Sequence, residues 1–175
     1  MAQQLWFLRH GDAEPHDARP DPERRLTPRG ERQSWAAGLA LARLGIEFAA
    51  VFTSPRLRAL DTARLACEAL GREPVVHEPL SGGFDAREAL VLARGIDDGP
   101  ILLVGHEPDF SQVVRDLTGG RIALRKGGLA AVRLESAEGE LIVVMRPREL
   151  EALADMGRLS GADRQAGNEA QAVKS

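Results

Sequence analysis

The sequence is short of several features that would assign a chain to a specialised class. It has a single cysteine, Cys67, so no internal disulfide can form and a reducing compartment fits. Its apolar runs are far shorter than the roughly 20 residues of a membrane-spanning helix, and residues 1–4 lack the basic and apolar segments of a signal peptide. Neither sign of charge dominates, because 23 basic residues are balanced by 26 acidic ones and the net charge is −3. These absences predict a cytoplasmic protein with no nucleic-acid or membrane partner.

The chain nevertheless has the material for one folded unit. Its 175 residues are 43% hydrophobic, which suits a single domain and argues against wholesale disorder. We expect that domain to span residues 1–155. Residues 156–175 are polar and rich in glycine, alanine and glutamine, and are predicted to be a disordered tail. Cys67 lies in a helix-like apolar segment, which favours a small core residue over a catalytic thiol.

Strand-like and helix-like segments alternate along the chain. Short apolar runs predict strands at residues 5–8, 49–53, 74–77 and 101–104, and a closing hairpin of residues 129–134 and 141–145. Helical periodicity predicts helices at residues 30–44, 55–70, 85–94, 109–117 and 147–154. Trp6 in the first strand and Trp35 in the first helix are both expected on buried faces. The order predicts a three-layer α/β/α fold, in which helices cover both faces of a mostly parallel sheet with an antiparallel edge.

Charged side chains cluster where three of the predicted strands end. They are Arg9 and His10, followed by Gly11, after the first strand, Arg58 after the second, and His106 after the fourth. Because ligands of open α/β sheets bind beyond the carboxyl ends of the strands, we expect these residues to share one pocket. Ser54 is a suitable cap for the helix after the second strand, with Pro55 as its first residue. The free N–H groups of such a helix start also attract anions.

Two arginines and two histidines, with no carboxylate partner that the spacing demands, indicate a pocket for a dianion such as a phosphoryl group. A neutral imidazole can attack phosphorus, while cationic side chains stabilise charge on the phosphoryl oxygens. The competing interpretation is a metal site with His10, Asp12 and His106 as ligands. Two arginines would repel a cation beside them, so the residue set favours phosphoryl transfer without a metal.

Four motifs extend this pattern beyond the pocket. They are Leu8-Arg9-His10-Gly11, Arg25-Leu26-Thr27-Pro28-Arg29-Gly30, Ser54-Pro55-Arg56-Leu57-Arg58-Ala59-Leu60-Asp61-Thr62-Ala63 and Val104-Gly105-His106-Glu107-Pro108. Together they resemble the histidine phosphatase superfamily, also called the phosphoglycerate-mutase-like family, and above all its short bacterial branch of SixA-type phosphohistidine phosphatases. The similarity covers about residues 4–146, and the set is far more specific than a lone Arg-His-Gly. The resemblance implies a phosphoglycerate-mutase-like fold without a metal or organic cofactor.

The resemblance also implies a role for each pocket residue. It makes His10 the nucleophile that becomes phosphorylated, His106 the second pocket histidine, Arg9 and Arg58 the arginines that bind the phosphoryl group, and Gly11 the residue that lets the backbone pass close to it. Arg56 is expected at the rim, because Arg58 directly precedes the family's Ala-x-x-Thr. The polar loop at residues 16–22 is expected to form one wall of the pocket. A phosphorylated substrate would release inorganic phosphate.

The chain departs from the wider family in the segment after the third strand, where mutases and many ester phosphatases carry an acid that protonates a departing alkoxide. Here Asp85 and Glu88 are more simply the cap and first turn of the next helix, and Asp12 and Glu14 are the acids nearest to His10 in the sequence. The general acid stays open among these four, or none.

A phosphoramidate has a weak P–N bond and needs less help from an acid, which favours a phosphohistidine protein as substrate and partner. A small phosphomonoester is the alternative substrate. A phospho-binding module without turnover is a third interpretation, and a mutase is the weakest.

Overall fold

The computed structural model describes residues 2–97, 99–136 and 138–156. The predicted tail at residues 156–175 lies outside the described residues except for its first residue, which belongs to a helix at residues 147–156. Within the described ranges, no helix is both long and apolar enough to cross a membrane.

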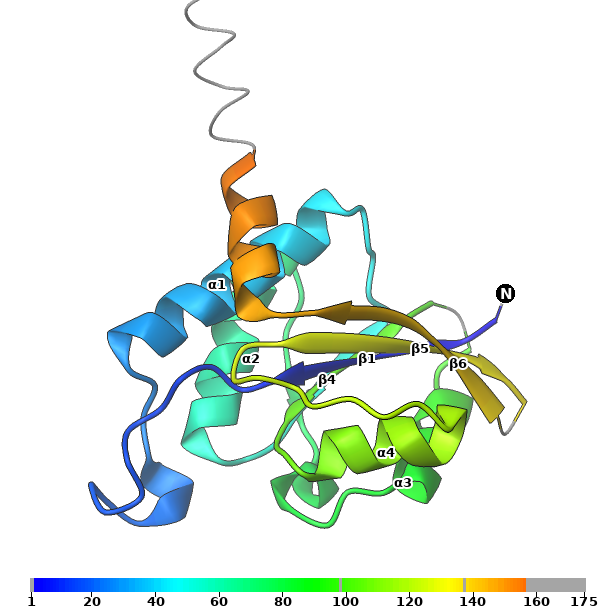
Figure 1. The fold of residues 1–175 in the computed structure, drawn as a ribbon, viewed down its shortest axis with the longest axis horizontal. Helices are drawn as coiled ribbons and strands as arrows, with labels where there is room; N and C mark the ends of the chain where they lie inside the picture. Colours follow the sequence, from blue (N-terminus) through cyan, green and yellow to red (C-terminus); the bar gives the residue numbers. More distant parts are fainter. Residues whose placement is uncertain (1, 98, 137, 157–175) are drawn as a thin grey trace, which may run out of the picture.

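Six strands form one sheet in the order β3-β2-β4-β1-β5-β6 (Figure 1). They are β1 (Gln4–Arg9), β2 (Ala50–Thr53), β3 (Val75–Val76), β4 (Ile101–Gly105), β5 (Leu129–Glu135) and β6 (Glu138–Met145). The first four strands pair in parallel, whereas β5 runs antiparallel to both β1 and β6. The predicted mostly parallel sheet with a hairpin at its antiparallel edge is therefore confirmed.

Helices cover both faces of this sheet, as predicted. They are α1 (Pro28–Arg43), α2 (Leu57–Leu70), α3 (Ala86–Arg94), α4 (Asp109–Thr118) and the helix at residues 147–156, with short 3-10 turns η1 (Asp21–Glu23) and η2 (Glu78–Ser81). The helices α1, α2 and 147–156 lie on one face and α3 and α4 on the other (Figure 1). Thr27 caps α1 by accepting a hydrogen bond from the Gly30 amide at 3.1 Å.

The central strands supply both cores, because successive side chains of a strand point to opposite faces. In β1, Leu5 and Phe7 pack with α3 and α4, while Trp6 and Leu8 pack with α1, α2 and the helix at residues 147–156. Cys67 belongs to this second core and is buried, as expected; burial raises the pKa of its thiol to about 11. Each large side chain buried this way stabilises the fold by about 1.5–3 kcal/mol.

Two details of the helices differ from the prediction. Trp6 is buried, but Trp35 is 38% exposed, because the buried stripe of α1 passes through Ala36, Ala37 and Ala40 instead. Helix α2 begins at Leu57 rather than Pro55, so Ser54 is not its cap.

The small residues of α1 allow an unusually close approach to α2. A Cβ atom added at Gly38 would lie 2.2 Å from the carbonyl oxygen of Ala66 and 2.5 Å from its Cα. Since backbone atoms cannot rotate out of the way, this contact requires glycine. A bulky tryptophan cannot enter such an interface, which explains why Trp35 stays at its edge.

We expect Gly38→Ala to lower the free energy of unfolding by about 1–2 kcal/mol in urea titrations. Overpacking costs about 1–3 kcal/mol, and the better helix propensity of alanine, about 1 kcal/mol, offsets only part of that cost. Gly95→Ala is the matched control, because Gly95 has a φ of −81° and a Cβ there meets nothing closer than 3.6 Å. Equal stability of the two variants would contradict the proposed close contact.

Candidate active site

Strand register brings the predicted site histidines together at the carboxyl edge of the sheet. The His10 amide donates a hydrogen bond to the carbonyl of Gly105 at 3.0 Å, and the Ser54 amide donates to Val104 at 3.0 Å. The imidazole rings of His10 and His106 consequently lie 5.2 Å apart between centroids. Both side chains are buried, with about one-twentieth of their surface exposed. Segments nearly 100 residues apart thus form a single pocket.

Hydrogen bonds define the protonation state of His10. Its Nδ1 lies 2.7 Å from the carbonyl oxygen of Gly11, and a carbonyl can only accept, so Nδ1 carries the ring proton. The lone pair is therefore on Nε2, which accepts a hydrogen bond from Arg58 Nε at 3.3 Å. Burial lowers the pKa of His10 to about 3. The hydrogen bond to Gly11 opposes this shift, and the charge of Arg58 adds to it. The imidazole is neutral at pH 7 and has a free nitrogen lone pair.

His106 has a complementary arrangement. Its Nε2 lies 2.7 Å from Ser54 Oγ, which also accepts a hydrogen bond from the Arg56 amide at 3.2 Å. Among the described residues, His106 Nε2 is the only acceptor that the Ser54 hydroxyl proton reaches, so the ring proton of neutral His106 is on Nδ1. That Nδ1 is buried and has no partner within the described part of the chain. Burial, followed by the proximity of His10, lowers the pKa of His106 to about 3.

Arg9 lies beside this pocket and is held from the far side. It donates to the carbonyl of Leu124 at 2.8 Å, and the Glu107 carboxylate accepts from the Leu124 amide at 3.3 Å. The charge of Arg9 contributes to the lowered pKa of His10, after burial and the charge of Arg58. Its buried Nε has no partner among the residues described.

Gly11 is constrained by packing against the start of α1. A Cβ atom at this position would lie 2.5 Å from the carbonyl oxygen of Gly30. The Gly11 amide donates to Thr62 Oγ1 at 3.0 Å, which ties the turn after β1 to α2. This turn fixes the carbonyl that accepts from His10.

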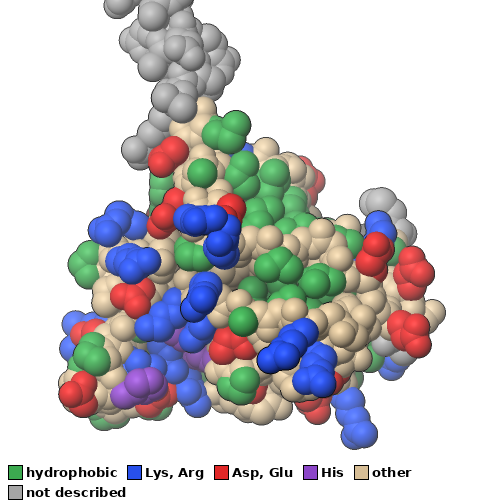
Figure 2. Space-filling view, in the orientation of Figure 1, with side chains coloured by type: hydrophobic (Ala, Val, Ile, Leu, Met, Phe, Trp, Pro, Cys, Tyr) green, Lys and Arg blue, Asp and Glu red, His purple; other side chains and the backbone are tan. Residues whose placement is uncertain are grey.

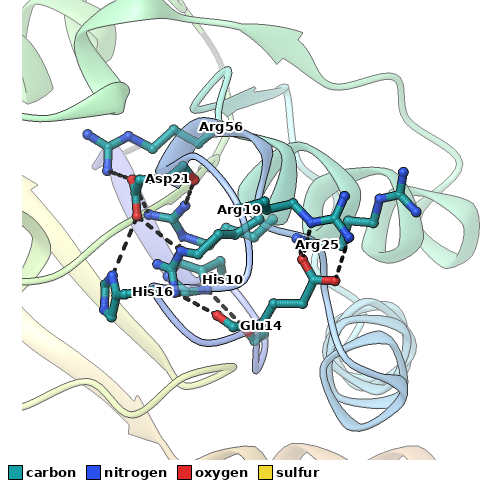
Figure 3. Close-up of polar contacts among 10 residues, drawn as sticks. His10, Glu14, His16, Arg19, Asp21, Arg25 and Arg56 are labelled. Atoms are coloured by element: carbon teal, nitrogen blue, oxygen red, sulfur yellow. Dashed lines mark hydrogen bonds and ion pairs between the residues drawn. The ribbon is translucent and has the colours of Figure 1, made fainter.

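Arg58, one of the two predicted pocket arginines, has a carboxylate partner, contrary to the sequence-based interpretation. Asp21 Oδ2 accepts from Arg56 at 2.7 Å and from Arg58 at 3.2 Å, and the Asp21 carbonyl accepts from Arg58 at 2.7 Å (Figure 3). Its other carboxylate oxygen accepts from Arg24 at 3.0 Å and lies 3.7 Å from His16 Nδ1. Although partial burial opposes the shift, the charge of Arg58 keeps the pKa of Asp21 below its usual range. The Asp21 carboxylate thus pairs with Arg58, the arginine that was predicted to bind phosphate.

Sequence reasoning missed this contact for a physical reason. The loop at residues 16–22 was expected to line the pocket, but Asp21 lies between two prolines in a segment without periodicity. Its partner Arg58 is 37 positions away, and no local pattern joins the two. The one feature of the sequence that pointed to this contact is that Asp21 is an acid in the loop that follows Arg9 and His10.

The other acids near the nucleophile are engaged elsewhere. Asp12 accepts hydrogen bonds from Lys126 at 3.1 Å and from Thr27 Oγ1 at 2.9 Å. Burial alone would raise the pKa of Asp12, but these two bonds lower it below its usual value. Glu14 accepts from the Arg25 amide at 2.9 Å, the main cause of its lowered pKa (Figure 3). Both side chains are held as carboxylates, which are poor proton donors at pH 7.

The acids after β3 are also accounted for. Asp85 caps α3 by accepting from the amides of Arg87 at 2.9 Å and Glu88 at 3.0 Å, as predicted. The Glu88 carboxylate lies 3.9 Å from His77 Nε2. In the described ranges, the side-chain hydrogen bonds of His10 and His106 go to Gly11, Arg58 and Ser54, and not to any of these acids.

The competing metal interpretation finds no support in the geometry. In the described part of the chain, no three side chains of histidine, cysteine, aspartate or glutamate gather as metal ligands. Asp12, the predicted third ligand, bonds to Lys126 and Thr27 instead.

Comparison with known proteins identifies the family of this chain. The profile of the histidine phosphatase superfamily (branch 1) matches residues 5–81. An uncharacterized protein of Picosynechococcus sp. is 33% identical over 162 residues, which cover 84% of this chain and 98% of that protein. The chain belongs to the histidine phosphatase superfamily. Membership indicates a phosphatase, as the motifs predicted.

Solved structures relate this histidine phosphatase to the SixA group. The protein histidine phosphatase SixA, complexed with tungstate, is 27% identical, with a TM-score of 0.75 over 84% of this chain and 99% of that one. A SixA structure from Agrobacterium tumefaciens has the same fold, at 20% identity and a TM-score of 0.69 over 84% and 99% of the two chains. The predicted family and fold are confirmed.

The buried neutral histidines predict a pH-dependent stability. Both have a folded-state pKa of about 3 against 6.5 for the unfolded chain, so between these values the unfolded chain binds more protons and stability falls as pH falls. Each histidine contributes a slope of at most about 1.4 kcal/mol per pH unit. Urea titrations between pH 7 and 5 should show a steeper loss in the wild type than in His10→Gln/His106→Gln. Parallel curves would contradict burial of two neutral imidazoles.

Proposed function

We propose that this histidine phosphatase hydrolyses phosphohistidine in a protein through a phosphorylated His10, within the domain at residues 1–155 and without a metal. The observation that carries the proposal is the state of the ionisable groups. The two imidazoles are neutral, while Asp12, Glu14 and Asp21 are held as anions. The site therefore supplies a nucleophile but no evident acid for a difficult leaving group.

In the first step, His10 Nε2 attacks phosphorus in line with the bond that breaks. Its proton is already on Nδ1, so no base has to remove one before the attack. The electron pair of Nε2 forms the new N–P bond. The electron pair of the substrate's P–N bond returns to the substrate imidazole, which leaves as a neutral ring because its other nitrogen carries a proton. In the second step, water attacks the phosphorus on His10, the N–P bond breaks, and its electron pair returns to Nε2 and restores the neutral ring. The protons of the attacking water leave with inorganic phosphate.

Cationic and neutral donors are placed to stabilise the phosphoryl oxygens. Arg58 adjoins His10 Nε2, and the ring of His106 neighbours that of His10. Among the described residues, His106 Nδ1 and the Nε of Arg9, the residue before His10, have no hydrogen-bond partner. Such donors lower the barrier because they are fixed before charge develops on the phosphoryl group. A buried donor without a partner is costly in the free protein, and a phosphoryl oxygen would satisfy it.

The leaving group distinguishes the two candidate substrates. An ester releases an alkoxide, which needs a proton from a positioned acid, whereas the imidazole of phosphohistidine is a better leaving group. Asp12, Glu14 and Asp21 have lowered pKa values, and Asp85 caps a helix. This set of acids supports a phosphoramidate over a phosphomonoester. The 27% identity to the protein histidine phosphatase SixA supports the same choice.

We expect His10→Ala to abolish turnover of a phosphohistidine protein, and Arg58→Ala to lower kcat by about 10²–10³, the effect of losing one preorganised donor. Phosphate release measures both, and rapid quenching with labelled substrate should trap phosphate on His10 of the wild type. His16→Ala is the control that keeps most activity, because it removes an exposed imidazole of the adjoining loop. Turnover by His10→Ala, or strong inhibition by a chelator, would refute the mechanism. Faster turnover of small esters than of phosphohistidine would favour the alternative substrate.

Asp21 should compete with bound phosphate for the arginines. In Asp21→Asn the amide keeps the shape of the side chain but removes its negative charge, so inorganic phosphate or tungstate should bind more tightly, by about three- to tenfold. Calorimetric titration measures the affinity, and Asp17→Asn, a change in the same loop, is the control. Weaker binding in Asp21→Asn would show instead that the carboxylate holds Arg58 in place for the anion.

A further inference from the structure

A basic cleft of about 460 Å³ opens beside the predicted nucleophile. Its lining contains six cationic side chains, those of Arg9, Arg29, Arg125, Lys126, Arg146 and Arg148. Among the residues that the structure describes, the carboxylates that line it are those of Asp12 and Glu151. Figure 2 shows lysine and arginine side chains gathered below the helix at residues 147–156, with histidine atoms visible among them. The cleft is a local exception in a chain whose net charge is −3.

The cleft adjoins the candidate active site. Arg9, which directly precedes His10, and Asp12, which follows His10 by two residues, both line the cleft. The charge of Lys126, another lining residue, is also among those that lower the pKa of His10. A substrate whose phosphoryl group reaches His10 would therefore place its neighbouring atoms at this cleft.

Two of the cations have no side-chain partner within the described part of the chain. Arg146 and Arg148 bind Glu149, and Lys126 binds Asp12. By contrast, Arg29 and Arg125 make no ion pair or side-chain hydrogen bond with any other described residue. They lie on different segments, the first turn of α1 and the loop before β5, and line the same cleft. Their guanidinium groups are free to bind an external anion.

We infer that this cleft binds acidic side chains that flank the phosphorylated residue of a protein substrate. The inference rests on the proposed function and names the substrate feature that the same site selects. A cleft of this size holds several anionic groups, since one water occupies about 30 Å³. Its cations come from the end of β1, the start of α1, the loop at residues 125–126 and the segment at residues 146–148. This spread matches carboxylates along a polypeptide better than one compact second phosphate.

The test compares two phosphohistidine peptides of equal length, one flanked by aspartate and glutamate and the other by asparagine and glutamine. The wild type should hydrolyse the acidic peptide with a kcat/KM about tenfold higher, mainly through KM, because flanking charges bind equally in the ground and transition states. In Arg29→Gln/Arg125→Gln the advantage should fall to about twofold. Salt at 1 M should also reduce it, because the screening length falls from about 10 Å at 0.1 M to about 3 Å.

Arg72→Gln/Arg121→Gln is the matched control, because it removes two exposed arginines outside the cleft and should keep the full preference. Turnover of both peptides at equal kcat/KM would refute this inference and leave the proposed function standing. A preference that survives equally in both double variants would also refute it. Turnover of neither peptide, with hydrolysis of small esters, would refute the proposed function and this inference together. If turnover of a small bisphosphate depended on Arg29 and Arg125 while turnover of both peptides did not, the cleft would belong to a different ligand and the inference would be contradicted.

Discussion

The parallel pairing of β1 with β4 at the centre of the sheet brings two histidines from distant segments to a ring separation of 5.2 Å. The rest of the structure depends on this pairing. Both strands are buried on their two faces, so helices must cover the sheet on each side and separate cores form there. The remaining strands extend the sheet on both sides of this pair, and the segments that follow β1, β2 and β4 supply the polar groups of the site.

Burial gives the site its chemistry at a cost in stability. Water is excluded from His10 and His106, which disfavours their charged forms and leaves two neutral imidazoles. The Gly11 carbonyl then places the proton of His10 on Nδ1 and leaves the lone pair of Nε2 facing Arg58. The same desolvation penalises the fold when acid drives protons onto the unfolded chain.

Arg58 presents the opposite problem, because a buried guanidinium without an anion is strongly destabilising. Asp21 supplies that anion from the loop after β1, with Arg24 and Arg56 around the same carboxylate. Under the proposed function a phosphoryl group takes over this role, so that the loop and the substrate compete for one charge. The basic cleft lined by Arg9 continues the positive potential outward, and its Arg29 and Arg125 make no ion pair with any residue that the structure describes.

Local sequence patterns determined the elements of this protein, because period 2 and period 3.6 in apolar residues reflect burial that neighbouring positions share. The strands, the hairpin, the Asp85 cap and the meeting of strand ends followed from those patterns, and four short motifs indicated the family. Only the tertiary structure decided which face of α1 is buried, since Gly38 admits α2 closely and leaves Trp35 at the edge. It likewise decided that Ser54 binds His106 and that Asp21 binds Arg58. These contacts join loop or helix-start residues to distant partners, and no periodicity along the chain encodes the distance between such side chains.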